Sequence, residues 1–203
     1  MFIRRIFSSI FNLPGVVVHE LSHEFFCKVF NVKVIKVSYY NFHDSSGYVL
    51  HEEPKYLYQD VLIATAPFFL NSLIGAIIAL QIMINNQFQI SNLDDYNWIN
   101  ILGIWFSISI AKCAIPSNGD AKSILKHIAD SNTNFIFKLF TRIIVSPIVI
   151  VIYLGNLGSS WFKIDWLYGI SVFLIGPRLI SQLFDKIEPF LMNYFNLIKQ
   201  LNL

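Results

Sequence analysis

The chain alternates long apolar segments with short polar ones. Five segments are almost free of charged residues, and each approaches the length of about 20 residues that a helix needs to cross the hydrocarbon core of a bilayer. They cover roughly residues 14–30, 60–84, 98–115, 137–157 and 161–184. We therefore expect an all-α polytopic membrane protein with about five transmembrane helices.

Local signals subdivide this pattern. The sequence Asn-Leu-Gly-Ser-Ser at 156–160 predicts a turn between the fourth and fifth segments, and Gly176-Pro177 predicts that the fifth helix kinks or ends. Residues 2–12 form either a short amphipathic helix in the membrane interface or an extension of the first span. We treat residues 1–203 as a single membrane-embedded domain, with a core at about 10–130 and accessory helices at about 131–203.

A small β-hairpin is predicted between the first two spans. Residues 32–40 are rich in β-formers, residues 43–47 supply a turn, and a second short strand at 48–51 is ended by Pro54. The open edges of such a hairpin cannot face lipid, so we expect it at the interface or in a protein-lined cavity. An exposed edge could pair with an extended peptide, although the hairpin could also simply pack against the helices.

Composition and charge narrow the class of protein. Of the 203 residues, 55% are hydrophobic and only 14% are charged, which is unlike a soluble globule and makes the lipid bilayer the expected surroundings. The net charge of +2 comes from scattered basic residues, so we expect no nucleic-acid partner.

Charges in the connecting segments predict the orientation in the cell membrane. The segment 85–97 carries Asp94 and Asp95 without any lysine or arginine, whereas the segments 31–59 and 116–138 carry six lysines. The positive-inside rule therefore places the hairpin and the segment 116–138 in the cytoplasm. Arg4 and Arg5 favour the opposite orientation, and we give the loops more weight.

The strongest chemical signal is the sequence His19-Glu20-Leu21-Ser22-His23 inside the first apolar segment. Two histidines four residues apart on a helix lie on one face, about 5–6 Å apart, and can share a metal ion. Glu20 can then hold a metal-activated water, which indicates zinc and hydrolytic chemistry. The alternative is a histidine pair that is hydrogen-bonded within a helix bundle, but ionisable groups at membrane depth favour a functional role.

A catalytic zinc usually has three protein ligands and an open position, so a third ligand is expected elsewhere. The candidates are Asp120, His43, His51 and His127, whereas Glu24 points away from the histidine face. Asp120 ends the sequence Ser-Asn-Gly-Asp, so it could equally cap an amphipathic helix over residues 121–128.

Four motifs together resemble the site-2 protease family of intramembrane zinc metalloproteases. They are His19-Glu20-x-x-His23 in the first span, Gly47-Tyr48-Val49 in the hairpin, Ala66-Pro67 followed by Asn71 in the second span, and Gly119-Asp120 after the third. The resemblance covers about residues 10–125. It implies that His19, His23 and Asp120 bind Zn²⁺, that Glu20 is the catalytic base, and that Asn71 lies near the substrate. The implied substrate is a membrane protein with a single span, cleaved in or next to its unwound helix.

Two other functions fit the same residues. A non-enzymatic metal-binding membrane protein, such as an immunity or sensor partner, would hold the metal with four ligands, and His127 or His43 could supply the fourth. A membrane hydrolase of a non-peptide amide or a lipid-linked substrate would keep the open site and change only the substrate.

Overall fold

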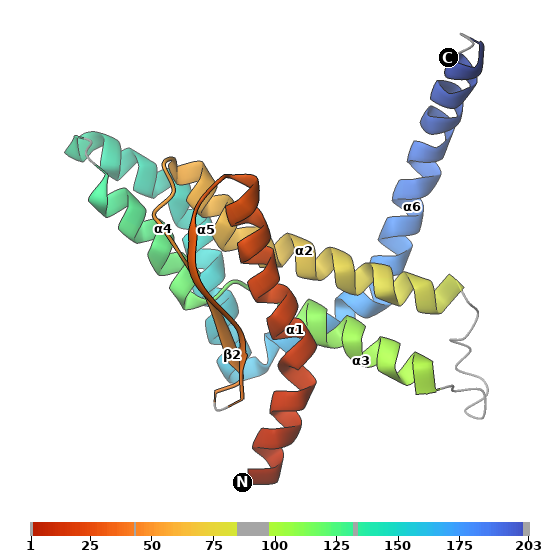
Figure 1. Cartoon of the computed structure of the whole chain (residues 1–203), viewed down its shortest axis with the longest axis horizontal. Coiled ribbons are helices and arrows are strands. Elements are labelled where there is room, and N and C mark those ends of the chain that lie inside the picture. Colours follow the sequence, from red (N-terminus) through yellow and green to blue (C-terminus); the bar gives the residue numbers. More distant parts are fainter. Residues whose placement is uncertain (1, 43, 85–97, 132–133, 201–203) are drawn as a thin grey trace.

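The computed structural model describes residues 2–42, 44–84, 98–131 and 134–200, which form six helices and one two-stranded antiparallel hairpin (Figure 1). In chain order, these elements are α1 (Phe2–Val29), β1 (Val34–Asn41), β2 (Ser46–His51), α2 (Leu57–Ile84), α3 (Trp98–Lys112), α4 (Asn118–Asp130), α5 (Phe135–Phe162) and α6 (Ile164–Gln200). The predicted helical class and the hairpin after the first helix are confirmed.

Three of the five predicted spans coincide with helices that are long and apolar enough to cross a membrane. These helices are α2, α5 and the Ile164–Pro189 part of α6. The first and third predicted spans lie in α1 and in α3, which is apolar but 15 residues long. By length and composition, the described helices therefore suggest a multi-pass membrane protein.

Helix α1 is continuous, so residues 2–12 extend it and do not form a separate interfacial helix. Pro14 lies inside it and cannot donate a backbone hydrogen bond. Beside this proline, the Ser109 hydroxyl of α3 accepts from Gly15 N at 3.2 Å and donates to Phe11 O at 2.6 Å. In a regular α-helix, Gly15 N would donate directly to Phe11 O. Here the Ser109 hydroxyl of α3 bridges these two groups of the α1 backbone.

Helix α2 is the centre of the molecule and contacts α1, α3, α4 and α6. Its two ends belong to two apolar clusters, one shared with α4 and α5 and the other with α3 and α6. The buried residues of the first are Ala64, Ala121, Ile124, Ile128, Val145, Val149 and Ile152. Those of the second are Ala79, Ile82 and Phe173. The C-terminal half of α6 projects away from the other helices (Figure 1).

The prediction of a turn at 156–160 is wrong, because α5 continues to Phe162 and the chain reverses at Lys163, in the left-handed conformation with φ of 56°. The polar side chains that suggested a turn are satisfied within the helix. Asn156 Nδ2 donates to Ile152 O, and Ser160 Oγ donates to Asn156 O. In an apolar environment, an unbroken helix keeps the backbone groups paired, and this preference outweighs the local turn propensity.

Gly176-Pro177 does not end α6, which continues to Gln200. Both residues are buried, and a Cβ added at Gly176 would lie 2.7 Å from the Ala76 Cβ of α2. The glycine therefore allows α2 and α6 to approach closely, as small residues do at helix contacts in membranes.

The hairpin packs along α1. The Tyr40 hydroxyl of β1 donates to Ser9 O at 2.6 Å, and the Ser9 hydroxyl lies 2.8 Å from that of Ser45 in the turn. Ser45 adopts a positive φ of 54°, which reverses the chain between the strands. The predicted ligand candidate His43 lies outside the described residues.

Replacing Gly15 with alanine should destabilise the protein, because the added Cβ would lie 2.1 Å from the Ser109 carbonyl oxygen. Overpacking of this kind typically costs about 1–3 kcal/mol. Gly155→Ala is the matched control, since its Cβ would meet only the Ile115 side chain, at 3.1 Å. Thermal unfolding in detergent should give a lower midpoint for Gly15→Ala alone, and equal midpoints would contradict the close approach of α1 and α3.

Candidate metal centre

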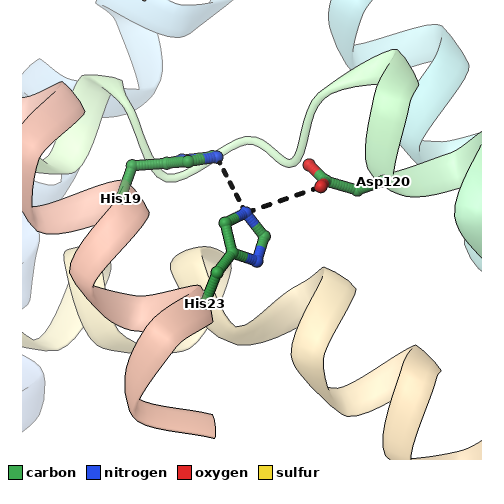
Figure 2. A group of neighbouring side chains, drawn as sticks. All are labelled: His19, His23 and Asp120. Carbon is green, nitrogen blue, oxygen red and sulfur yellow. Dashed lines mark hydrogen bonds and ion pairs between the residues drawn. The ribbon is translucent and has the colours of Figure 1, made fainter. Parts of the chain in front are cut away.

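The structure brings His19, His23 and Asp120 together, although α1 and α4 are far apart in the sequence (Figure 2). Their ligand atoms all lie within 4.8 Å of one another. The Nε2 atoms of the two histidines are 3.2 Å apart, and His23 Nε2 is 3.5 Å from Asp120 Oδ1. Figure 2 shows the carboxylate entering from the start of α4 and facing the His23 ring.

Backbone carbonyls fix the orientation of both imidazoles. His19 Nδ1 lies 2.7 Å from Cys113 O, and His23 Nδ1 lies 2.8 Å from Ile63 O. A carbonyl can only accept a hydrogen bond, so each Nδ1 must carry the hydrogen and donate it. A neutral imidazole that is protonated on Nδ1 has its lone pair on Nε2, and both lone pairs therefore face the centre of the group.

This arrangement leaves three acceptors facing one another: two Nε2 lone pairs and the Asp120 carboxylate oxygen. A metal ion or a shared proton among them would offset the repulsion between acceptors at this distance. Four ligands in a tetrahedron around zinc, with bonds of about 2.0–2.1 Å, are about 3.3 Å from one another. The observed separations of 3.2 Å and 3.5 Å are close to this spacing, and all the ligand atoms lie within 4.8 Å of one another, so the group could hold a metal ion.

Asp120 takes part in the capping box at the start of α4 and faces the histidines at the same time. Ser117 caps α4, since its hydroxyl accepts from Asp120 N at 3.2 Å, and Asp120 Oδ2 accepts from Ser117 N at 2.6 Å. This reciprocal capping box leaves the other oxygen, Oδ1, facing His23. The prediction that Asp120 caps a helix at 121–128 is therefore wrong: Ser117 is the N-cap, α4 begins at Asn118, and Asp120 is its third helical residue.

The group lies in a cavity of about 700 Å³ between α1, α4, the hairpin and the start of α2. Glu20 is buried and also lines this cavity. The hairpin covers it closely, since a Cβ added at Gly47 would lie 2.5 Å from Glu20 Cγ. Among the described residues, the Glu20 carboxylate has no hydrogen-bond partner, which leaves it able to bind a water or a substrate proton.

One edge of the hairpin faces the cavity. Every residue from Ser45 to His51 lines it, although alternate side chains of a strand point to opposite faces. Consecutive residues of a strand can all line a cavity only where the edge of the strand faces it. Since β1 pairs with one edge of β2, the edge along the cavity is the free one.

The remaining ligand candidates are placed elsewhere. His51 and His127 line the cavity without joining the three-residue group, and His127 Nδ1 faces Asp60 Oδ2 at 3.5 Å. Glu24 lies on the outer side of α1, where it accepts from the Tyr39 hydroxyl and pairs with Lys28 at 2.5 Å.

Asn71, the predicted substrate contact, is fully buried and does not line the cavity. Its Nδ2 donates to Gly15 O at 3.2 Å, to Ile110 O at 3.1 Å and to Cys113 O at 3.4 Å, so it joins α2 to α1 and to the end of α3. The Cys113 carbonyl also accepts from His19. These contacts favour a structural role, in which Asn71 holds the carbonyl that orients a ligand.

Sequence reasoning missed both orienting carbonyls, since any residue type supplies one. It also missed the buried carboxylate of Asp60, which lines the same cavity. Here a signal existed, because Asp60 opens a long apolar segment, and a buried acid in such a segment is costly unless it has a function.

Asn71→Ala should lower both the stability and the metal affinity, because it releases the Cys113 carbonyl. Unpaired buried groups cost about 1–3 kcal/mol, and loss of an outer-shell partner lowers metal affinity by about 10–100-fold. Ser72→Ala is the control, because that side chain bonds to Phe68 O and Tyr168 instead. If Asn71→Ala kept its metal affinity and bound substrate more weakly, the predicted role of Asn71 as a substrate contact would be supported instead.

His19→Ala, His23→Ala and Asp120→Asn should each remove one equivalent of bound divalent metal, because each loses a ligand or its charge. His51→Ala, which changes another histidine of the cavity, should retain that equivalent. Metal content of the purified protein after zinc loading and desalting provides the measurement. A metal content equal to that of the wild-type protein in all four variants would show that this group holds no metal.

The site thus combines a metal-binding group, a buried carboxylate and a strand edge in one cavity. Comparison with known proteins adds no family to these observations. No protein-family model matches the chain, and neither a curated protein nor a solved structure matches it.

Proposed function

We propose that this protein is an intramembrane zinc metalloprotease that hydrolyses peptide bonds in or next to a membrane-spanning helix. The observation that carries the proposal is the pair of imidazoles whose Nδ1 atoms face backbone carbonyls, with Asp120 and Glu20 in the same cavity. Two nitrogens and one carboxylate oxygen are ligands that suit zinc, and three protein ligands leave a coordination position for catalysis.

The bound zinc would activate a water molecule and polarise the scissile carbonyl. Glu20 accepts a proton from that water as the water oxygen attacks the carbonyl carbon, and it then gives the proton to the leaving amide nitrogen. A carbon–oxygen bond forms, the carbon–nitrogen bond breaks, and no further reactant is needed. His19 and His23 present Nε2 to the metal because Cys113 O and Ile63 O accept the hydrogens on Nδ1.

The free edge of β2 is the feature that supports a peptide substrate. An extended peptide can add to such an edge through main-chain hydrogen bonds, which do not depend on its sequence. A peptide laid along Ser45–His51 would pass through the cavity that holds Glu20 and the metal-binding group. A helical substrate must unwind first, because its own hydrogen bonds hide its amides.

The position of the group supports access for water from one side of the membrane. His23 lies six residues before the end of α1, and Ile63 lies six residues after the start of α2. At 1.5 Å per residue, both are about 9 Å from their helix ends. With five spans, the positive-inside rule favours a cytoplasmic location for these ends and for the active site of a multi-pass protein in the cell membrane.

The resemblance to site-2 proteases adds support from four motifs, and the separation of Asp120 from the histidines in the sequence agrees with it. Asn71 fits this proposal as a residue that positions the Cys113 carbonyl.

A non-enzymatic metal protein is the main alternative, and a four-ligand site would favour it. Among the described residues, neither His51 nor His127 belongs to the metal-binding group, which supports an open site within that part of the chain. A membrane hydrolase of another amide or of a lipid-linked substrate would share the site, so only a product assay separates it from a protease.

Glu20→Gln should abolish cleavage of a reconstituted single-span substrate while the protein keeps its zinc, because the amide cannot take the proton. General acid–base catalysis typically contributes about 10²–10⁴-fold, and the rate should fall by that amount. The readout is the appearance of cleaved fragments together with the zinc content.

Glu24→Gln is the matched control, since Glu24 lies one turn further along α1, does not line the cavity and binds Tyr39 and Lys28 instead. It should cleave at the wild-type rate. Undiminished cleavage by Glu20→Gln would refute the assigned base, and failure of the wild-type protein to cleave any peptide bond would favour the non-enzymatic alternative.

A further inference from the structure

A second cluster of polar side chains lies in the same cavity, and its centre is Asp60 at the start of α2. The Asp60 side chain is 1% exposed. Its Oδ1 accepts from the Ser123 hydroxyl of α4 at 3.0 Å, but its Oδ2 is buried without a hydrogen-bond partner among the described residues. Burial of an unpaired carboxylate oxygen is costly, so this atom indicates an unfilled binding role.

His127 of α4 faces the same oxygen. Its side chain is 11% exposed, and its Nδ1 is likewise buried without a hydrogen-bond partner in the described part of the chain. Nδ1 lies 3.5 Å from Asp60 Oδ2 and 3.9 Å from Oε1 of Glu53. Glu53 follows β2 and is 54% exposed, so its side chain has room to adjust.

We propose that Asp60, His127 and Glu53 form a second divalent-cation site, separate from the group of His19, His23 and Asp120. His127 Nδ1 and Asp60 Oδ2 are 3.5 Å apart, close to the spacing of about 3.3 Å between zinc ligands. The exposed Glu53 side chain, now 3.9 Å from Nδ1, would have to rotate to bring its carboxylate to the same ion. An imidazole nitrogen with carboxylate oxygens suits zinc or a similar first-row ion, whereas magnesium and calcium prefer oxygen ligands alone. The second site therefore takes a transition-metal ion.

The two sites share the same face of α4. Asp120, Ser123 and His127 follow one another at helical spacing, so Asp120 and His127 are about 10 Å apart along the axis. Paired catalytic metals are about 3.5–4 Å apart, so the second ion does not act on the substrate together with the first.

The second ion would join three segments that build the first site. Asp60 lies one turn before Ile63, whose carbonyl orients His23, and His127 lies on the helix that begins near Asp120. Glu53 belongs to the connection from the hairpin to α2. An ion bound here would fix α2, α4 and the hairpin around the cavity. Lys122 and Lys126 also line it, but both are exposed to solvent, which screens their charge.

Zinc stoichiometry of the full-length protein in detergent tests this proposal. The wild-type protein should bind two equivalents after loading and desalting. Asp60→Asn, which keeps the shape of the side chain, and His127→Gln should each bind one. The double variant His19→Ala/His23→Ala should also bind one, and adding Asp60→Asn to it should leave none. Lys126→Ala, a cavity residue of α4 outside both clusters, should still bind two.

A single equivalent in the wild-type protein that disappears in His19→Ala/His23→Ala would overturn the second site. Two equivalents retained in both Asp60→Asn and His127→Gln would overturn it as well. Helical circular dichroism and a monodisperse elution profile identify variants that are folded, and each of the two single variants provides the test independently. The outcome does not depend on proteolysis, because the metal count stands whether or not the protein cleaves a peptide.

Discussion

Two hydrogen bonds from imidazoles to backbone carbonyls determine what the cavity can do. Cys113 O and Ile63 O can only accept, so the hydrogens of His19 and His23 stay on Nδ1 and the lone pairs on Nε2 face each other. With the Asp120 oxygen beside them, the three acceptors form a group that could hold a metal ion. If either carbonyl were displaced, its ring could rotate or change its tautomer, and the metal-binding group would be lost.

Much of the fold places these two carbonyls. The Cys113 carbonyl follows α3, which is fixed to α1 by the Ser109 hydroxyl beside Pro14 and to α2 by Asn71. The Ile63 carbonyl belongs to α2, which packs against four other helices. Asp120 is held separately, by the capping box at the start of α4. Three independent packing arrangements therefore converge on one small group of atoms.

The sequence predicted those features of the fold and of the site that depend on residues close together in the chain. Apolar segments located the helices, and the four-residue spacing of His19 and His23 located two imidazoles that face each other. The turn predicted at 156–160 was wrong because Asn156 and Ser160 bond to carbonyls of their own helix. Local spacing also could not relate Asp120 to the histidines, nor Asp60 to His127, because tertiary packing alone makes these pairs neighbours.

X-ray absorption at the zinc edge tests the central claim most directly. The sample is the Asp60→Asn variant loaded with one equivalent of zinc, so that only the group of His19, His23 and Asp120 is observed. The account predicts two imidazole nitrogens and additional oxygen ligands, all at about 2.0–2.2 Å. A sulfur ligand at about 2.3 Å, or three or more imidazoles, would contradict it.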